Sequence, residues 1–136
     1  MRFDTKISIV VRDDLAQWQR LNVTAFLASG IAAGAPEIIG EPYEDRDGNG
    51  YLRMFRQPVL IYEAGPADLV AAHRRALERD LAIGIYTMDM FRTGHDEANR
   101  AVVRGAVTLD LAGIAVFGAR NAVDKVTKGI ALHPLA

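Results

Sequence analysis

The sequence lacks cysteine altogether, which excludes several classes of protein. Disulfide frameworks, thiolate zinc sites and cysteine nucleophiles all need a thiol. The three histidines, His73, His95 and His133, do not have the spacing of metal ligands. Ser8 and Ser29 are the only serines, and neither lies in the strand–turn–helix elbow that exposes a serine nucleophile. We therefore expect no bound metal in this chain.

Long apolar runs and a strong charge of either sign are also missing. No apolar stretch is long enough to span a bilayer, and the N-terminal sequence MRFDTKISIV lacks the apolar core of a signal peptide. A cytoplasmic protein without a membrane partner is the default expectation. The net charge of −1 gives no sign of a polyanion partner. Glycine-rich phosphate loops of the Walker or Rossmann type are absent, so no cofactor is expected.

What the chain does contain is a regular alternation of apolar, β-branched runs with segments of helical character. The expected strands are residues 6–12, 58–63, 81–88 and 112–117, and the expected helices are residues 20–33, 66–80, 96–103 and 121–128. This alternation predicts one α/β domain over residues 1–136, with helices covering both faces of a sheet. The core is expected to contain Ile7, Ile9, Val11, Leu60, Ile83, Ile85, Ile114 and Val116.

Residues 37–56 interrupt this alternation as an insertion. At its centre, the sequence DRDGNG of residues 45–50 has the acidic and glycine positions that begin an EF-hand calcium loop. The twelfth position of such a loop needs a bidentate glutamate, and here it is Arg56. Asp-Gly and Asn-Gly pairs are also strong signals for a tight hairpin turn. A surface β-hairpin without metal is the favoured interpretation, and a weak ion site is the alternative.

Four segments occur in an order that is typical of a known family. They are KISIVVRDDL at residues 6–15, QPVLIYEAGPADL at 57–69, MDMFRTG at 88–94 and AVDKVTKGIAL at 122–132. Together they resemble the type II peptidyl-tRNA hydrolase superfamily, which has a Val-Val-Arg-x-Asp-Leu strand, an Asp-Ala-Gly-Arg-Thr stretch and a final helix close to Asp-Lys-Val-Thr. The resemblance implies a three-layer α/β/α sandwich with a four-stranded mixed sheet, usually as a homodimer.

The resemblance also implies which residues would be catalytic. The superfamily's active-site acid and hydroxyl, within Asp-x-x-Arg-Thr, match Asp89 and Thr93. The superfamily's lysine near the start of the first helix falls on Asn22 when one residue is inserted and on Leu21 otherwise. Arg20 is near enough in sequence to take the place of that lysine. The chain thus resembles a side branch of the superfamily that lacks the catalytic lysine and histidine.

Each polar residue after the third strand also has a structural interpretation. Thr93, with Asp96 three positions later, has the pattern of a helix N-cap with a capping-box acid. Asp89 either accepts hydrogen bonds from loop amides or pairs with Arg92. His95 is expected in the first turn of a helix, where a histidine is usually solvated. Pattern alone does not decide between these roles and a functional one.

Convergence favours the functional interpretation. Ligands of open α/β sheets bind at the carboxyl ends of strands, and polar residues follow three of the strand ends here. If these strands are parallel neighbours, the residues share one crevice near the start of the first helix. The expected ligand-binding residues are Arg12, Asp14, Asn22, Arg92, His95 and Gly118.

Two functions follow from this interpretation. The first, which is favoured, is a domain without efficient peptidyl-tRNA hydrolysis that binds a small ligand or a protein partner in the crevice. The second is an ester hydrolase acting on peptidyl- or aminoacyl-tRNA, in which Asp89 and Thr93 position water and Arg20 or Arg92 stabilises the oxyanion. The near-neutral charge argues against tRNA as a partner, because tRNA affinity depends largely on phosphate contacts. Trp18 is expected either to cover the crevice or to make a dimer contact.

Overall fold

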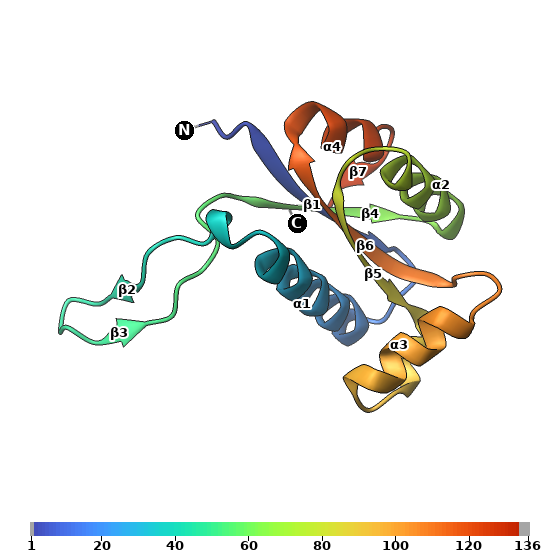
Figure 1. Cartoon of the computed structure of the whole chain (residues 1–136), viewed down its shortest axis with the longest axis horizontal. Coiled ribbons are helices and arrows are strands. Elements are labelled where there is room, and N and C mark those ends of the chain that lie inside the picture. Colours follow the sequence, from blue (N-terminus) through green and yellow to red (C-terminus); the bar gives the residue numbers. More distant parts are fainter. Residues whose placement is uncertain (1, 134–136) are drawn as a thin grey trace.

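The sheet at the centre of the protein has five strands of mixed direction (Figure 1). The computed structural model describes residues 2–133. The strand order is β5–β6–β1–β4–β7, in which β1 and β4 are parallel and the other neighbouring pairs are antiparallel. The strands of this sheet are β1 (Thr5–Arg12), β4 (Val59–Ala64), β5 (Ala82–Thr87), β6 (Leu111–Ala119) and β7 (Ala131–Leu132).

The predicted α/β class is confirmed, but the expected sheet of four strands was one strand short. The additional strand, β7, pairs with β4 through only two residues, Ala131 and Leu132. Two residues are too few to show the alternating pattern by which a strand is recognised in a sequence. The missing strand was therefore the one that carries no periodic signal.

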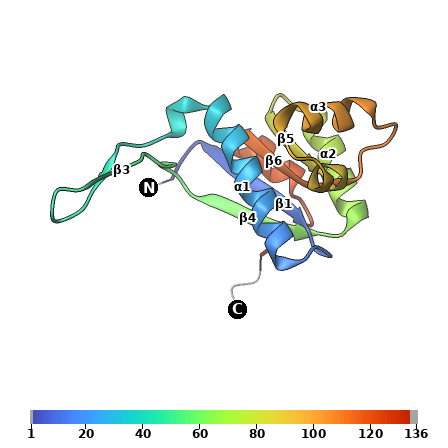
Figure 2. The ribbon, with the colours of Figure 1, turned by 90° about the horizontal axis from the view of Figure 1, so that it is seen from below.

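Helices pack on both faces of the sheet (Figure 2). On one face lies α1 (Gln17–Gly34), and on the other lie α2 (Pro66–Leu77) and α4 (Arg120–Val126). The short 3₁₀ helix η2 (Met88–Arg92) leads from β5 into α3 (Asp96–Gly105), which has no fully buried residue. Within residues 2–133, no helix combines the length and the apolar character needed to cross a membrane.

Side chains of β1 alternate between two cores, as strand geometry requires. Ile7, Ile9 and Val11 pack in the core beneath α1, whereas Val10 packs in the core beneath α2 and α4. Because both faces of this central strand are covered, its sequence is almost continuously apolar. The alternation explains how one strand anchors helices on opposite sides of the sheet.

Most of the predicted core is buried. The buried members are Ile7, Ile9, Val11, Ile114 and Val116. Leu60, Ile83 and Ile85 are only partly buried and pack against the edge of the second core. They lie on β4 and β5, and these strands are less completely covered than the central β1 and β6 because β5 forms one edge of the sheet and β4 is flanked only by the short β7.

A hairpin projects from the body of the protein between η1 (Pro36–Ile38) and β4 (Figures 1 and 2). Its strands, β2 (Tyr43–Glu44) and β3 (Gly50–Tyr51), pair antiparallel. Gly48, in the connecting turn, has a φ of 85°, in the left-handed region that favours glycine. The predicted hairpin turn at residues 45–50 is therefore confirmed. Residues 41–54 are called the arm below.

Candidate functional site

The sheet topology decides which strand ends meet. Strand β6 is antiparallel to both β1 and β5, so β1, β4 and β5 point the same way and end at one edge. Gly118 lies near the C-terminal end of β6 and pairs with Lys6 near the start of β1, at the opposite edge of the sheet. The expectation that Gly118 shares the crevice was wrong, because the fourth predicted strand is antiparallel to its neighbours. Gly118 instead makes room for Leu81, whose Cδ2 lies 2.4 Å from where a Cβ would be.

A cleft of about 320 Å³ lies between α1 and the η2–α3 segment, beyond the end of β5. It is called the aromatic cleft here, and its lining residues are Trp18, Asn22, Phe26, Tyr86, Met90, Phe91, Thr93, Gly94, His95, Asp96 and Asn99. Three of the predicted site residues, Asn22, Thr93 and His95, are among them, and so is Trp18, which was expected to cover the crevice or to make a dimer contact. A volume of this size suits a small molecule.

Four aromatic rings form the wall of the aromatic cleft. Tyr86 contacts Phe91, with ring centroids 5.0 Å apart, and Phe26, at 5.5 Å. Trp18 meets Phe91 edge-on at 5.7 Å. These tilted arrangements are the favourable ones for aromatic pairs. Because Trp18 and Phe26 remain about half exposed or more, two of the four rings present accessible apolar surface.

The hydroxyl proton of Tyr86 is not engaged in the hydrogen bond between Tyr86 and Asn22. The Asn22 Nδ2 donates to the Tyr86 oxygen at 3.1 Å, so the tyrosine is the acceptor in this bond. Partial burial raises the pKa of Tyr86, and the hydrogen bond from Asn22 opposes that rise. The phenol therefore stays protonated at neutral pH. Its proton can be donated to an acceptor atom in the cleft.

His95 has a defined tautomer because it caps α3. Its Nδ1 accepts from the backbone N–H of Ala98 at 3.2 Å, which requires the neutral ring to carry its proton on Nε2. The interpretation of Thr93 as the N-cap was wrong, because the residue that caps α3 is His95, which directly precedes Asp96. The Thr93 hydroxyl instead donates to the Met90 carbonyl at 2.9 Å and hydrogen-bonds the Asn99 side chain.

Asp89 and Arg92 lie outside the aromatic cleft. Asp89 Oδ1 accepts from Arg92 Nη2 at 2.6 Å, and both side chains are exposed. The structural interpretation of Asp89 as an ion-pair partner of Arg92 is confirmed. Neither residue lines the cleft in which Thr93 lies. The acid and the hydroxyl of the superfamily motif therefore face different surroundings in this structure.

Arg12 and Asp14 form a link at the end of β1. The Arg12 guanidinium donates to Asp14 through Nε at 2.7 Å, and to Asp110 and the Leu111 carbonyl through Nη1 at 2.8 and 3.2 Å. With its side chain mostly buried, Arg12 ties the end of β1 to the segment that enters β6. Neither Arg12 nor Asp14 lines the aromatic cleft.

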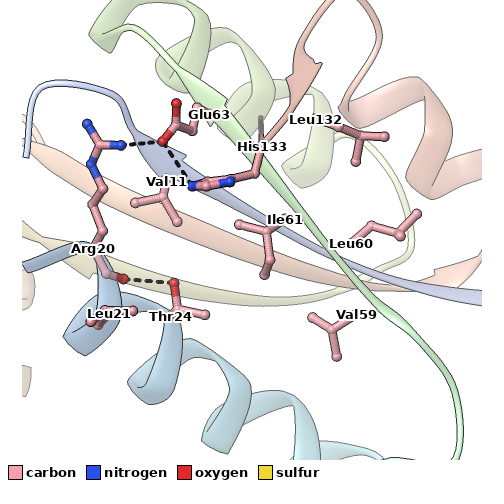
Figure 3. Close-up of a pocket in the computed structure, with 10 residues that line it drawn as sticks. All are labelled: Val11, Arg20, Leu21, Thr24, Val59, Leu60, Ile61, Glu63, Leu132 and His133. Atoms are coloured by element: carbon pink, nitrogen blue, oxygen red, sulfur yellow. Dashed lines mark hydrogen bonds and ion pairs between the residues drawn. The ribbon is translucent and has the colours of Figure 1, made fainter. Parts of the chain in front are cut away.

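Arg20 lies at one end of a second hollow, on the other flank of α1, with its side chain directed toward Glu63 (Figure 3). This apolar cleft, of about 460 Å³, is lined by Val11, Arg20, Leu21, Thr24, Val59, Leu60, Ile61, Glu63, Leu132 and His133. Arg20 pairs with Glu63 and donates to the backbone carbonyls of Asp13 and Leu15 at 2.6 and 3.1 Å. These contacts direct its guanidinium away from Asn22 and Thr93.

The sequence did not point to Tyr86 or Asn99 as site residues. Tyr86 lies in an apolar strand, and Asn99 lies in the middle of the predicted third helix. A tyrosine hydroxyl in a buried strand usually finds a hydrogen-bond partner, so Tyr86 did carry a usable signal. Asn99 carried none, because its place in the cleft depends on how α3 is oriented.

Comparison with known proteins identifies a family but no activity. The profile of the DUF2000 family, described as proteins of unknown function, matches residues 5–134. The solved structure of Atu0240, a protein of unknown function from Agrobacterium tumefaciens, is 49% identical to this chain. The match covers 98% of this chain and 100% of that one, with a TM-score of 0.95. No curated protein matches the sequence.

Proposed function

The chain belongs to the DUF2000 family of proteins of unknown function, and we propose that it binds an uncharged, planar ligand with a carbonyl oxygen in the aromatic cleft. The observation that carries the proposal is the combination of aromatic walls with two free proton donors. Tyr86 offers its O–H, because the oxygen accepts from Asn22, and His95 offers Nε2–H, because Nδ1 accepts from Ala98. Both donors line the same cleft.

The charges around the aromatic cleft restrict the ligand further. Among the described residues that line it, none is an arginine or a lysine. Its one acid, Asp96, is paired with Arg100. A carboxylate or phosphate ligand would thus lose water without gaining a cationic partner. An aromatic amide fits better, because its ring stacks on exposed aromatic surface and its oxygen accepts from Tyr86 or His95.

The single tryptophan of the chain gives a direct assay. Trp18 lines the cleft, so bound ligand should change its fluorescence. Titration with benzamide and nicotinamide is expected to give saturable changes. Benzoate tests the effect of negative charge, and cyclohexanecarboxamide tests the need for a planar ring. Both should bind more weakly than the aromatic amides.

A matched pair of tyrosine variants tests the role of the hydroxyl. Tyr86→Phe removes the proposed donor, and Tyr43→Phe makes the same chemical change in the arm, far from the cleft. Tyr86→Phe is expected to weaken amide binding about tenfold, as loss of one hydrogen bond implies. Equal binding by the two variants, or no binding of either amide at millimolar concentration, would refute the proposal.

We also propose that the fold is the three-layer sandwich of the type II peptidyl-tRNA hydrolases. What supports this relationship is the order of the four matching sequence segments together with helices on both faces of a mixed sheet. An ester hydrolase acting on peptidyl- or aminoacyl-tRNA is the second candidate function, supported by Thr93 in the aromatic cleft. Against it stand the pairing of Asp89 with Arg92 and the direction of Arg20, and no arginine or lysine is among the described residues that line the cleft with Thr93.

A further inference from the structure

The arm projects away from the body of the protein (Figures 1 and 2), and it exposes large apolar side chains. Leu52 is 87% exposed, Met54 57%, Tyr51 55% and Tyr43 49%. A two-stranded hairpin has little stability of its own in water. Clustered apolar residues on an exposed surface commonly mark an interaction site. The arm thus has the composition of a surface that is covered by a partner.

Hydrogen bonds hold the turn at the tip of the arm and tie the arm together at its base. At the tip, Asp45 accepts from the backbone N–H groups of Asp47 and Asn49 at 2.9 Å each, and from the Tyr51 hydroxyl at 2.6 Å. At the base, the Gly40 N–H donates to the Met54 carbonyl at 2.8 Å. The arm therefore needs little ordering when it binds, which favours association.

The arm lies within the part of the chain that matches a solved relative. Residues 41–54 make up about a tenth of the chain. The match to the Agrobacterium protein extends over 98% of the chain at a TM-score of 0.95, so it includes most or all of the arm.

The apolar cleft is a complementary surface on the same chain (Figure 3). Val59 and Ile61 of β4 form its floor, while Leu21 and Leu132 stand at its rim, 64% and 55% exposed. Strand β4 begins only a few residues after the arm ends, so arm and cleft lie along one continuous stretch of chain. Because β7 pairs only with Tyr62 and Glu63, the outer edge of β4 at Val59 has no neighbouring strand within residues 2–133.

We propose that two copies of this chain form a two-fold dimer in which the arm of each packs into the apolar cleft of the other. Arm and cleft adjoin one another, so a two-fold axis near the base of the arm brings both contacts into one interface with the same patch on each subunit. The interface does not involve the aromatic cleft, so it stands independently of the proposed ligand.

The charge of the arm argues against a nucleic acid or an anionic membrane as its partner. The arm contains four acidic residues, Glu41, Glu44, Asp45 and Asp47, against two arginines, Arg46 and Arg53. Its resulting negative charge repels nucleic acids and anionic membrane surfaces, both of which bind basic segments. A second copy offers instead an apolar cleft in which the charged end, Arg20 with Glu63, is already paired.

Sedimentation or light scattering over a range of concentrations tests the dimer. The wild type is expected to be dimeric. Leu52→Asp in the arm and Leu21→Asp at the rim of the cleft should each weaken dimerisation about 100-fold, as loss of an interface anchor typically does. Val107→Asp is the matched control. Val107 is fully exposed in the segment after α3, and it neither belongs to the arm nor lines the apolar cleft. Circular dichroism melting checks that each variant is folded.

Mixing the two variants distinguishes this interface from other ways of pairing. A homodimer of either variant has both of its arm–cleft contacts damaged, whereas a heterodimer of Leu52→Asp with Leu21→Asp retains one intact contact. The mixture should therefore dimerise more tightly than either variant alone. A monomeric wild type would overturn the proposal. So would a Leu21→Asp variant as dimeric as Val107→Asp, or a mixture that shows no recovery.

Discussion

Gly113 of β6 lies directly beneath α1, and its replacement by alanine is expected to destabilise the protein. A Cβ at this position would lie 2.7 Å from Val23 Cγ1, 3.2 Å from Leu27 Cδ1 and 3.0 Å from the Val10 carbonyl oxygen. The two side chains belong to α1, but the carbonyl belongs to the central strand β1. Because that oxygen is fixed in the sheet, the strain must be relieved by moving α1 outward.

The size of this effect follows from two opposing contributions. Overpacking a well-packed core by one methyl group costs about 1–3 kcal/mol. Replacing glycine within a strand by alanine returns about 0.5–1 kcal/mol of backbone entropy. The difference spans about 0–2.5 kcal/mol, and the close contact with the fixed Val10 carbonyl places the expected loss for Gly113→Ala in its middle, at about 1–2 kcal/mol in the free energy of unfolding. For a chain of 136 residues, this corresponds to a fall of roughly 3–8 °C in melting temperature.

Gly84→Ala provides a matched control on the neighbouring strand β5. A Cβ there would lie 3.5 Å from Leu27 Cδ2 and 3.9 Å from Ala115 Cβ, which are ordinary contacts. The entropy gain should then dominate, and Gly84→Ala should be neutral or slightly stabilising. Thermal and urea unfolding of the two variants measure the difference. A Gly113→Ala variant as stable as Gly84→Ala would show that α1 does not rest on β6 as described.

Three further predictions concern the arm and the alternative activity. The pKa of Asp45 is lowered from 3.8 to about 2, mainly by the hydrogen bond from Tyr51. Ionised Asp45 therefore stabilises the arm above about pH 4, and this contribution is lost as the pH falls toward 2. A carboxyl carbon NMR titration of Asp45 with a midpoint near 3.8 would contradict this. Calcium should leave the melting temperature unchanged, because the loop position that needs glutamate is Arg56; a rise of several degrees at sub-millimolar calcium would refute it. This chain should hydrolyse peptidyl-tRNA on the order of 100- to 1000-fold more slowly than true hydrolases do, because the superfamily's charge-stabilising lysine is missing. Fast turnover that both Asp89→Ala and Arg20→Ala abolish would instead establish that the chain is a hydrolase.

The parts of the fold that were predictable are those that bury a long periodic surface. The run KISIVVR identified β1, because a central strand with both faces covered must be apolar at almost every position. The two-residue strand β7 and the orientation of β6 were not predictable in this way. Their place depends on pairing with distant strands, and an apolar run has the same appearance in either direction.

The candidate site was predictable only in part for a related reason. Thr93 and His95 were found because polar residues follow the end of an apolar strand, and both line the aromatic cleft. Asp89, although only four residues before Thr93, turns outward to pair with Arg92, because the 3₁₀ helix η2 distributes successive side chains around its axis. Thr93 and His95 therefore share the cleft, whereas Asp89 does not, although it is close to both in the sequence.

Helix α1 shows why Arg20 and Asn22 serve different surfaces despite being two residues apart. Val23, Leu27 and Ile31 recur at intervals of four and are buried against the sheet. With about 100° of rotation per residue, residues 18, 22 and 26 follow one flank of this buried stripe, and residues 20, 21 and 24 follow the other. The first set lines the aromatic cleft and the second lines the apolar cleft.

This division of α1 bears on how the chain departs from the hydrolases that it resembles. A residue of α1 that stabilises charge beside Thr93 must lie on the flank that carries Asn22, because the other flank lines the apolar cleft. Arg20 lies on the wrong flank and is held there by Glu63 and by two backbone carbonyls. Length and charge alone therefore do not allow Arg20 to replace the missing lysine. If the proposed roles of the two clefts are right, substitutions at Leu21 change self-association and those at Asn22 change ligand binding, although the two residues are adjacent in the sequence.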